Sequence, residues 1–171
     1  NSLGGVGVAY NVQIMAIKAA QYSGVLSATD IAEGILYAVE QGADVINMSF
    51  GGYARSQVEE DALATAFGQA VLVAAAGNDA RANSPCPYAR DMYPAAYDWV
   101  LGVMAEREIP DAEGDLLASF SNYDCAPNDG TEYELMAPGV DIWSTLPDAQ
   151  YAAWDGTSMA TPHVSAVAAL V

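Results

Sequence analysis

The sequence predicts an α/β fold: a mostly parallel, buried sheet with helices on both faces, in one partial domain over residues 1–171. Short, almost uninterrupted apolar runs alternate with longer amphipathic runs, and loops such as Ser49-Phe50-Gly51-Gly52 and Gly77-Asn78-Asp79 follow the second and third apolar runs. This order of strand, helix, strand, helix, strand is typical of parallel sheets with right-handed crossovers. The length suffices for one sizeable core, and we find no internal repeat or interdomain linker.

The first elements follow from local patterns. Residues 1–10 form a glycine-rich loop, and residues 11–19 are predicted as a buried strand because they are nearly continuously apolar. Residues 29–41 are predicted as a helix, with Ser27 or Thr29 as its cap and Gly42 as its end. Residues 43–48 then predict a second buried strand.

The second half continues the alternation. Residues 56–69 predict a helix with acidic residues in its first turn, and strands are expected at 70–76 and 99–105. A hairpin or loop is expected at 109–115, and short strands at 132–136 and 140–144. A last helix begins near Ser158 and is apolar on nearly every side, which predicts that it is buried.

The charge excludes some functions. The chain carries 22 acidic and 5 basic residues, a net charge of −17, which argues against nucleic-acid binding because phosphates need Lys and Arg. A salt-rich habitat or ordinary secretion would each explain the excess of acidic residues. No run is long and apolar enough to predict a membrane span, and no signal peptide is visible at Asn1.

Ser158 is the first candidate catalytic residue. It lies where a loop (Asp155, Gly156, Thr157) becomes the last helix. A hydroxyl there meets the positive end of the helix dipole and free backbone N–H groups, which suits a nucleophile whose product is an oxyanion. The alternative is a simple helix cap. Asn78, directly after an apolar strand, could donate to the same oxyanion or could simply be a turn residue.

The run G-T-S-M-A-T-P-H-V at 156–164 resembles the nucleophile motif of the subtilisin-like serine proteases. Other runs resemble segments of that family in the same order, so the resemblance covers nearly the whole chain: A-A-G-N at 75–78, Y-P-A at 93–95, A-S-F-S-N-Y at 118–123, M-A-P-G-V-D-I at 136–142 and G-V-G-V-A at 5–9.

The resemblance implies peptide-bond hydrolysis with Ser158 as nucleophile and Asn78 in the oxyanion hole, and no cofactor for the chemistry. It also implies two walls that bind an extended polypeptide substrate as an added strand: Ser49, Phe50 and Gly51 on one side, and Ala75, Ala76 and Gly77 on the other. Small residues on the second wall leave room for a bulky apolar side chain.

The resemblance further implies a disulfide between Cys86 and Cys125, as in some secreted members, and hence an extracellular location. Backbone carbonyls of Ala95, Tyr97 and Val100 resemble a weak cation site. Asn1, Leu3 and Gly5 resemble part of a calcium loop; hard cations prefer such oxygen ligands.

One part of the family pattern is missing. A serine nucleophile needs a base and an orienting carboxylate, but the only histidine, His163, lies five residues after Ser158 on the same helix and so points elsewhere. It resembles a non-catalytic histidine of the family. We therefore interpret the chain as the C-terminal part of a catalytic domain, inactive alone, whose partner is the missing N-terminal segment.

Two other functions compete with this interpretation. A pseudoprotease or peptide-binding module would keep the cleft and lack the base. An esterase of unrelated fold would want G-x-S-x-G, and Ala160 stands at the last position. We also expect that an incomplete domain exposes sheet edge and core and forms a swapped or packed dimer.

Overall fold

The computed structural model describes residues 6–108, 116–126 and 133–171. In chain order its elements are α1 (Ala28–Glu40), β1 (Val45–Met48), α2 (Gln57–Ala66), β2 (Val71–Ala75), β3 (Leu101–Arg107), β4 (Leu116–Leu117), β5 (Leu135–Pro138), β6 (Ile142–Leu146), the 3-10 turn η1 (Pro147–Ala149), β7 (Gln150–Trp154) and α3 (Thr157–Ala168).

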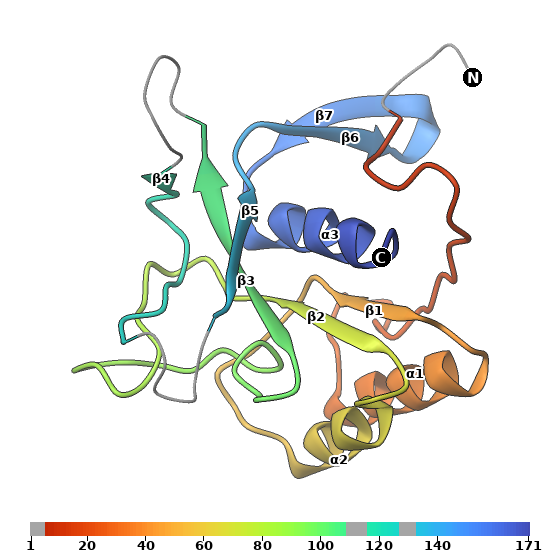
Figure 1. The fold of residues 1–171 in the computed structure, drawn as a ribbon, viewed down its shortest axis with the longest axis horizontal. Helices are drawn as coiled ribbons and strands as arrows, with labels where there is room; N and C mark the ends of the chain where they lie inside the picture. Colours follow the sequence, from red (N-terminus) through yellow and green to blue (C-terminus); the bar gives the residue numbers. More distant parts are fainter. Residues whose placement is uncertain (1–5, 109–115, 127–132) are drawn as a thin grey trace.

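The main sheet has the order β1-β2-β3-β4, with β5 also paired to β3. The pairs β1–β2, β2–β3 and β3–β5 are parallel, and only the short β4 runs antiparallel to its neighbour. Figure 1 shows α1 and α2 against one face of this sheet and α3 against the other. The predicted α/β fold with helices on both faces is therefore confirmed.

Side-chain alternation along β2 builds a core on each face. Leu72 and Ala74 pack into the cluster that contains Ile35 of α1 and Leu63 of α2. Val73 points the other way, into the cluster that contains Ala160 of α3. Because both faces of β2 are covered, its sequence is continuously apolar, as expected for a central parallel strand.

The helices on the first face begin where serine caps them. The Ser27 Oγ accepts a hydrogen bond from the Asp30 N–H at 3.1 Å, so Ser27, rather than Thr29, caps α1. The Ser56 Oγ accepts from the Glu59 N–H and caps α2 in the same way. Gly42, at a positive φ, follows α1, as the sequence predicted.

The strand predicted for residues 11–19 is wrong. This segment, red to orange in Figure 1, runs as irregular backbone outside the sheet. Ile14 is 84% exposed, and Val12 and Ile17 are about 40% exposed. A strand exists only through hydrogen bonds to a neighbour, and among the described residues no strand pairs with this segment.

The prediction that the last helix is buried is wrong for its second half. Thr157, Ala160 and Thr161 are buried in α3, but Val167 and Leu170, further along, are more than half exposed. Val164 still packs against the cluster of Val73 and Val103, and the Ser165 Oγ donates to the Asn47 Oδ1 of β1 at 2.9 Å, so the sheet covers the helix up to about this point and not at Val167. Apolar composition therefore does not report burial where the described chain offers no covering element.

Smaller corrections concern the strand bounds. The strands predicted at 99–105, 132–136 and 140–144 occur two or three residues later, as β3, β5 and β6. Strand β7 was not predicted; it pairs antiparallel with β6 in a separate hairpin. The hairpin or loop predicted at 109–115 and residues 1–5 of the predicted N-terminal loop lie outside the described residues.

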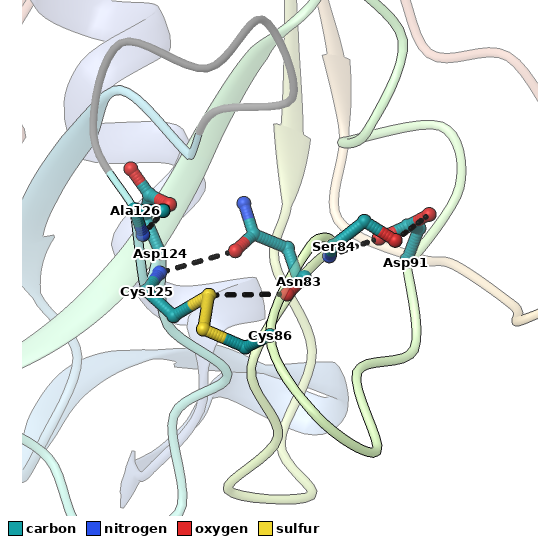
Figure 2. The surroundings of a disulfide bond; sticks show 7 residues. All are labelled: Asn83, Ser84, Cys86, Asp91, Asp124, Cys125 and Ala126. Atoms are coloured by element: carbon teal, nitrogen blue, oxygen red, sulfur yellow. Dashed lines mark hydrogen bonds between the residues drawn. A yellow bond between two sulfur atoms is a disulfide. The ribbon is translucent and has the colours of Figure 1, made fainter.

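A disulfide joins Cys86 to Cys125, with 6.3 Å between their Cα atoms (Figure 2), as the resemblance implied. It ties the loop that precedes β3 to the segment that follows β4. In the described part of the chain, no helix has the length and apolar character needed to cross a membrane.

Candidate active site

The predicted site residues meet at the carboxyl ends of β1 and β2, where ligands bind in open parallel sheets. The N-terminus of α3 points into the same place. A cavity of about 200 Å³ is found there, lined by Phe50, Gly51, Ala75, Gly77, Asn78, Asp79, Met92, Thr157 and Ser158. A larger hollow, of about 290 Å³, lies between residues 17–21 and the start of α1, and no predicted site residue lines it.

Ser158 is the second residue of α3, and its hydroxyl is tied to the first wall of the cavity. Its Oγ donates to the Ser49 carbonyl at 3.0 Å, and the Ser49 Oγ donates to the Ser158 carbonyl at the same distance. These two bonds join residues that are 109 positions apart in the sequence. In this state the serine hydroxyl is a hydrogen-bond donor to backbone and is not activated by a base.

Asn78 is oriented by the same helix terminus. Its Oδ1 accepts from the Thr157 N–H at 2.8 Å and from the Thr157 Oγ1 at 2.9 Å. A backbone N–H can only donate, so the oxygen must face Thr157 and the amide NH₂ must face away. A Cβ built on Gly156 would lie 3.5 Å from the Asn78 Nδ2. The NH₂ is thus held beside the start of α3 with its donors available to the cavity.

One backbone donor and one side-chain donor therefore lie at the start of α3, close to Ser158. The Ser158 N–H belongs to the first turn of a helix, where N–H groups have no helical partner, and it carries the positive end of the helix dipole. The Asn78 NH₂ adds a side-chain donor. Such an arrangement can stabilise the oxyanion formed when a nucleophile attacks a carbonyl.

The glycine of each wall packs too closely against Met92 for a larger residue. A Cβ on Gly51 would lie 2.9 Å from the Met92 Sδ, and a Cβ on Gly77 would lie 2.4 Å from the Met92 Cε. Gly77 also has φ +103°, which side chains rarely tolerate. Ala76 is fully buried behind the cavity and does not line it.

The outer edge of the cavity is polar. The Tyr53 hydroxyl donates to the Asp79 Oδ2 at 2.5 Å, and the Arg90 guanidinium lies 4.2 Å above the Tyr53 ring. Burial, followed by the hydrogen bond to Asp79, raises the pKa of Tyr53. The phenol therefore remains a neutral donor at physiological pH.

Sequence reasoning missed several residues at this site. Thr157 was interpreted only as a turn or cap residue, although its hydroxyl donates to Asn78 and accepts from the Gly77 N–H at 3.1 Å. Met92 and Asp79 were not predicted at all. The only sequence signal for these two residues is that Asp79 directly follows the A-A-G-N run and Met92 directly precedes the Y-P-A run.

His163 does not serve Ser158. Its Nδ1 lies 2.9 Å from the Met159 carbonyl, one turn earlier on α3. Since the chain has one histidine, none of its 171 residues supplies an imidazole base to the Ser158 hydroxyl. This agrees with the prediction that His163 is non-catalytic.

The implied cation sites involve backbone carbonyls of buried residues and the N-terminal loop. Ala95, Tyr97 and Val100 are buried, but the Tyr97 carbonyl already accepts the Val100 N–H at 2.9 Å and keeps one lone pair. Within the ranges that the structure describes, no cluster of three or more metal-ligating side chains occurs. The carbonyl site remains a prediction, and the calcium loop at Asn1, Leu3 and Gly5 lies outside the described residues.

Comparison with known proteins gives one consistent result. The chain is 40% identical over its whole length to the thermophilic serine proteinase of Bacillus sp. (strain AK1) and 41% identical to subtilisin DY of Bacillus licheniformis. It spans 38% and 58% of those relatives' lengths.

Solved structures are similar as well. The S41 psychrophilic protease superposes with a TM-score of 0.74 at 30% identity, over 84% of this chain and 49% of that one. Sphericase superposes with a TM-score of 0.75 at 28% identity, over 86% and 50%. The sequence model of the subtilase family matches residues 1–171. This chain therefore belongs to the subtilase family.

Proposed function

We propose that the protein to which this chain belongs is a serine endopeptidase. Ser158 attacks the scissile carbonyl, and the Asn78 NH₂ and the Ser158 N–H hold the resulting oxyanion. The observation that carries this proposal is the orientation of Asn78, which lines the cavity and whose Oδ1 is bound by Thr157 at 2.8 and 2.9 Å, so that its NH₂ is left to donate. Oriented donors of this kind stabilise charge that develops in the transition state.

The substrate in this proposal is an extended polypeptide. Its backbone lies along Ser49–Gly51 and 75–77, and one side chain enters the cavity of about 200 Å³. The cavity floor and walls carry Met92, Phe50 and Ala75, so an apolar side chain of moderate size fits the proposal. Hydrolysis then proceeds by acyl transfer to Ser158, followed by attack of water on the acyl-enzyme.

The base and its carboxylate come from outside these residues in the proposal. The Ser158 hydroxyl here donates to the Ser49 carbonyl, and a base must break that bond before the oxygen can attack. The isolated chain is therefore inactive. In subtilisin, a member of this family, loss of the triad Ser or His lowers turnover by about 10⁶, and we carry that magnitude over.

An extracellular location belongs to the same proposal. The Cys86–Cys125 disulfide supports it, because structural disulfides persist in oxidising compartments. The net charge of −17 keeps such a protein dispersed.

Active-site labelling tests the proposal. The isolated chain and the complete gene product are treated with a fluorophosphonate, and adducts are measured by intact mass. We expect a stoichiometric adduct on the complete product, none on its Ser158→Ala variant, and none on the isolated chain while circular dichroism shows it to be folded. An unlabelled complete product would favour the pseudoprotease. Rapid proteolysis by the pure isolated chain would overturn the severed-triad interpretation.

A further inference from the structure

A buried asparagine, Asn122, binds the backbone on both sides of Asn78. It is fully buried and lies in the A-S-F-S-N-Y run that follows β4. On the near side, its N–H donates to the Gly77 carbonyl at 2.8 Å and its Nδ2 donates to the Ala76 carbonyl at 2.8 Å. On the far side, its Oδ1 accepts from the Asp79 N–H at 3.1 Å.

Further bonds close a network around this side chain. The Asn122 Oδ1 also accepts from the Arg81 N–H at 3.0 Å, and the Nδ2 reaches the Tyr53 hydroxyl at 3.3 Å. That hydroxyl in turn donates to Asp79. The Asn122 side chain thus binds three backbone groups within residues 76–81 and the Tyr53 hydroxyl, and the Asn122 backbone N–H binds a fourth backbone group, the Gly77 carbonyl.

The loop at residues 76–81 needs hydrogen-bond partners from outside itself. It begins where β2 ends, so its backbone groups have no ladder to satisfy them, and buried polar groups must be paired. Gly77 adopts φ +103° with its Cα so close to Asn122 that a Cβ would lie 2.5 Å from the Nδ2. The path of the loop is therefore shaped against the Asn122 amide.

We propose that Asn122 is a positioning residue for catalysis. It holds the backbone on either side of Asn78 so that the Asn78 NH₂ meets the oxyanion, while Thr157 sets the side-chain rotation. Asn122 itself contacts neither substrate nor the reacting atoms. The inference rests on the proposed function, because it assumes that Asn78 is an oxyanion donor. Displacements of about 1 Å can cost 10²-fold in rate, so a buried amide behind the loop matters.

Asn83 provides a matched control. It is also fully buried, but its Oδ1 accepts from the Cys125 N–H at 3.1 Å, and its backbone N–H donates to the Tyr123 carbonyl at 3.2 Å. Figure 2 shows its side chain directed toward Cys125, beside the disulfide. Truncating Asn83 removes a buried amide of the same kind from a place that does not hold Asn78.

The test is a double-mutant cycle in the complete gene product, measuring kcat and KM on a peptide amide. Asn122→Ala should lower kcat about 10- to 100-fold with KM within about twofold. Asn83→Ala should leave kcat within about twofold while it lowers the unfolding midpoint. In an Asn78→Ala background, Asn122→Ala should cost less than about threefold, because its target has gone.

Two results would overturn the inference: a full loss that persists in the Asn78→Ala background, or an Asn122→Ala variant that behaves like Asn83→Ala. If Asn78→Ala alone leaves kcat unchanged, the proposed oxyanion role itself fails, and the inference fails with it. Failure of the proposed function can be told apart from failure of the inference alone, because it already appears in the Asn78→Ala single variant.

Asn122→Asp covers the case in which the alanine variant does not fold. The aspartate keeps an oxygen for the Asp79 and Arg81 N–H groups, but when ionised it repels the Ala76 carbonyl that the Nδ2 had bound. When protonated, it can donate to that carbonyl. The ratio of variant to wild-type kcat should therefore fall as the pH rises. A low ratio that does not change with pH, or a ratio near one throughout, would contradict the inference.

Discussion

The two halves of α3 have similar small and apolar residues but are covered to different extents. In the first half, Thr157, Ala160 and Thr161 are buried against the sheet, and hydrogen bonds tie Thr157 to Asn78 and Gly77. In the second half, Val167 is 54% exposed, and Leu170, just after the end of the helix, is 60% exposed. The first half is buried by its contacts with the sheet, whereas the contacts of the second half end with Val164 and Ser165, so the same small and apolar composition gives less burial there.

The largest expected effect on the free energy of unfolding comes from enlarging a buried alanine of α3, compared with an exposed alanine at its C-terminal end. Ala160 is fully buried in the cluster with Val73 and Val103, so Ala160→Leu must displace packed neighbours and should lower the free energy of unfolding by about 3 kcal/mol. Ala169, the exposed C-cap of α3, is the control. Ala169→Leu should change the free energy of unfolding by less than about 0.5 kcal/mol. Urea unfolding of both variants measures this. Equal losses would contradict the comparison.

The next effect concerns the polar contacts of the first half. Thr157→Val removes the hydroxyl that donates to Asn78 and leaves the buried Gly77 N–H without its acceptor, which should cost about 1–2 kcal/mol of unfolding free energy. Under the proposed function, kcat of the complete gene product also falls.

Thr161→Val is the control for this prediction. The Thr161 hydroxyl is equally buried but donates only to the Thr157 carbonyl within the helix. Its removal should cost under about 0.5 kcal/mol, because the carbonyl can still accept the helical N–H. If thermal unfolding ranks the two valine variants in the reverse order, the importance assigned to Thr157 is wrong.

The contrast between the halves of α3 also explains what the sequence could predict. Local signals predicted the alternation of strands and helices and narrowed the cap of α1 to Ser27 or Thr29, because a cap and the apolar run of β2 act through neighbours close in sequence. Ser158 and Asn78 were found because a motif and a strand end mark them.

The features that the sequence did not predict depend on contacts between residues far apart in the chain. The Asn122 network joins positions more than 40 apart, and no local pattern reports it. The failed strand at 11–19 and the exposed end of α3 have the same cause: an apolar segment is buried only if another element covers it. Strand β7 was missed because its Gln-Tyr-Ala-Ala-Trp sequence has no clear alternation.

A third prediction compares buried polar groups in the first turns of two helices. Thr157 in α3 has partners, whereas in α2 the buried Glu59 has an Oε1 with no hydrogen-bond partner in the described residues. Burial raises the pKa of Glu59. Folding therefore favours the protonated carboxyl, and the stability it contributes is full below the unfolded pKa and is lost as the pH rises through the folded pKa.

The Glu59→Gln variant tests the direction in which stability changes with pH. The amide stays neutral, so the variant should gain stability relative to the wild type as the pH rises above about 4.3, the ordinary glutamate value. Thermal midpoints between pH 4 and 9 measure the difference. The exposed Asp61→Asn, on the same helix, should show no such trend. A wild-type advantage that grows with pH would mean that Glu59 is ionised and paired in the folded protein.

The smallest effect on stability is expected just after the C-terminal end of α3. Leu170→Ser should change the free energy of unfolding by less than about 0.5 kcal/mol, because a side chain that is 60% exposed has little contact to lose. Its effect should appear in association instead. The predicted dimer of the isolated chain would use exposed apolar surface such as this, and a serine there weakens it. Size-exclusion chromatography with light scattering at several concentrations measures the mass. A clean monomer in the wild type would contradict the predicted dimer, and a large loss of stability in Leu170→Ser would show that the second half is covered after all.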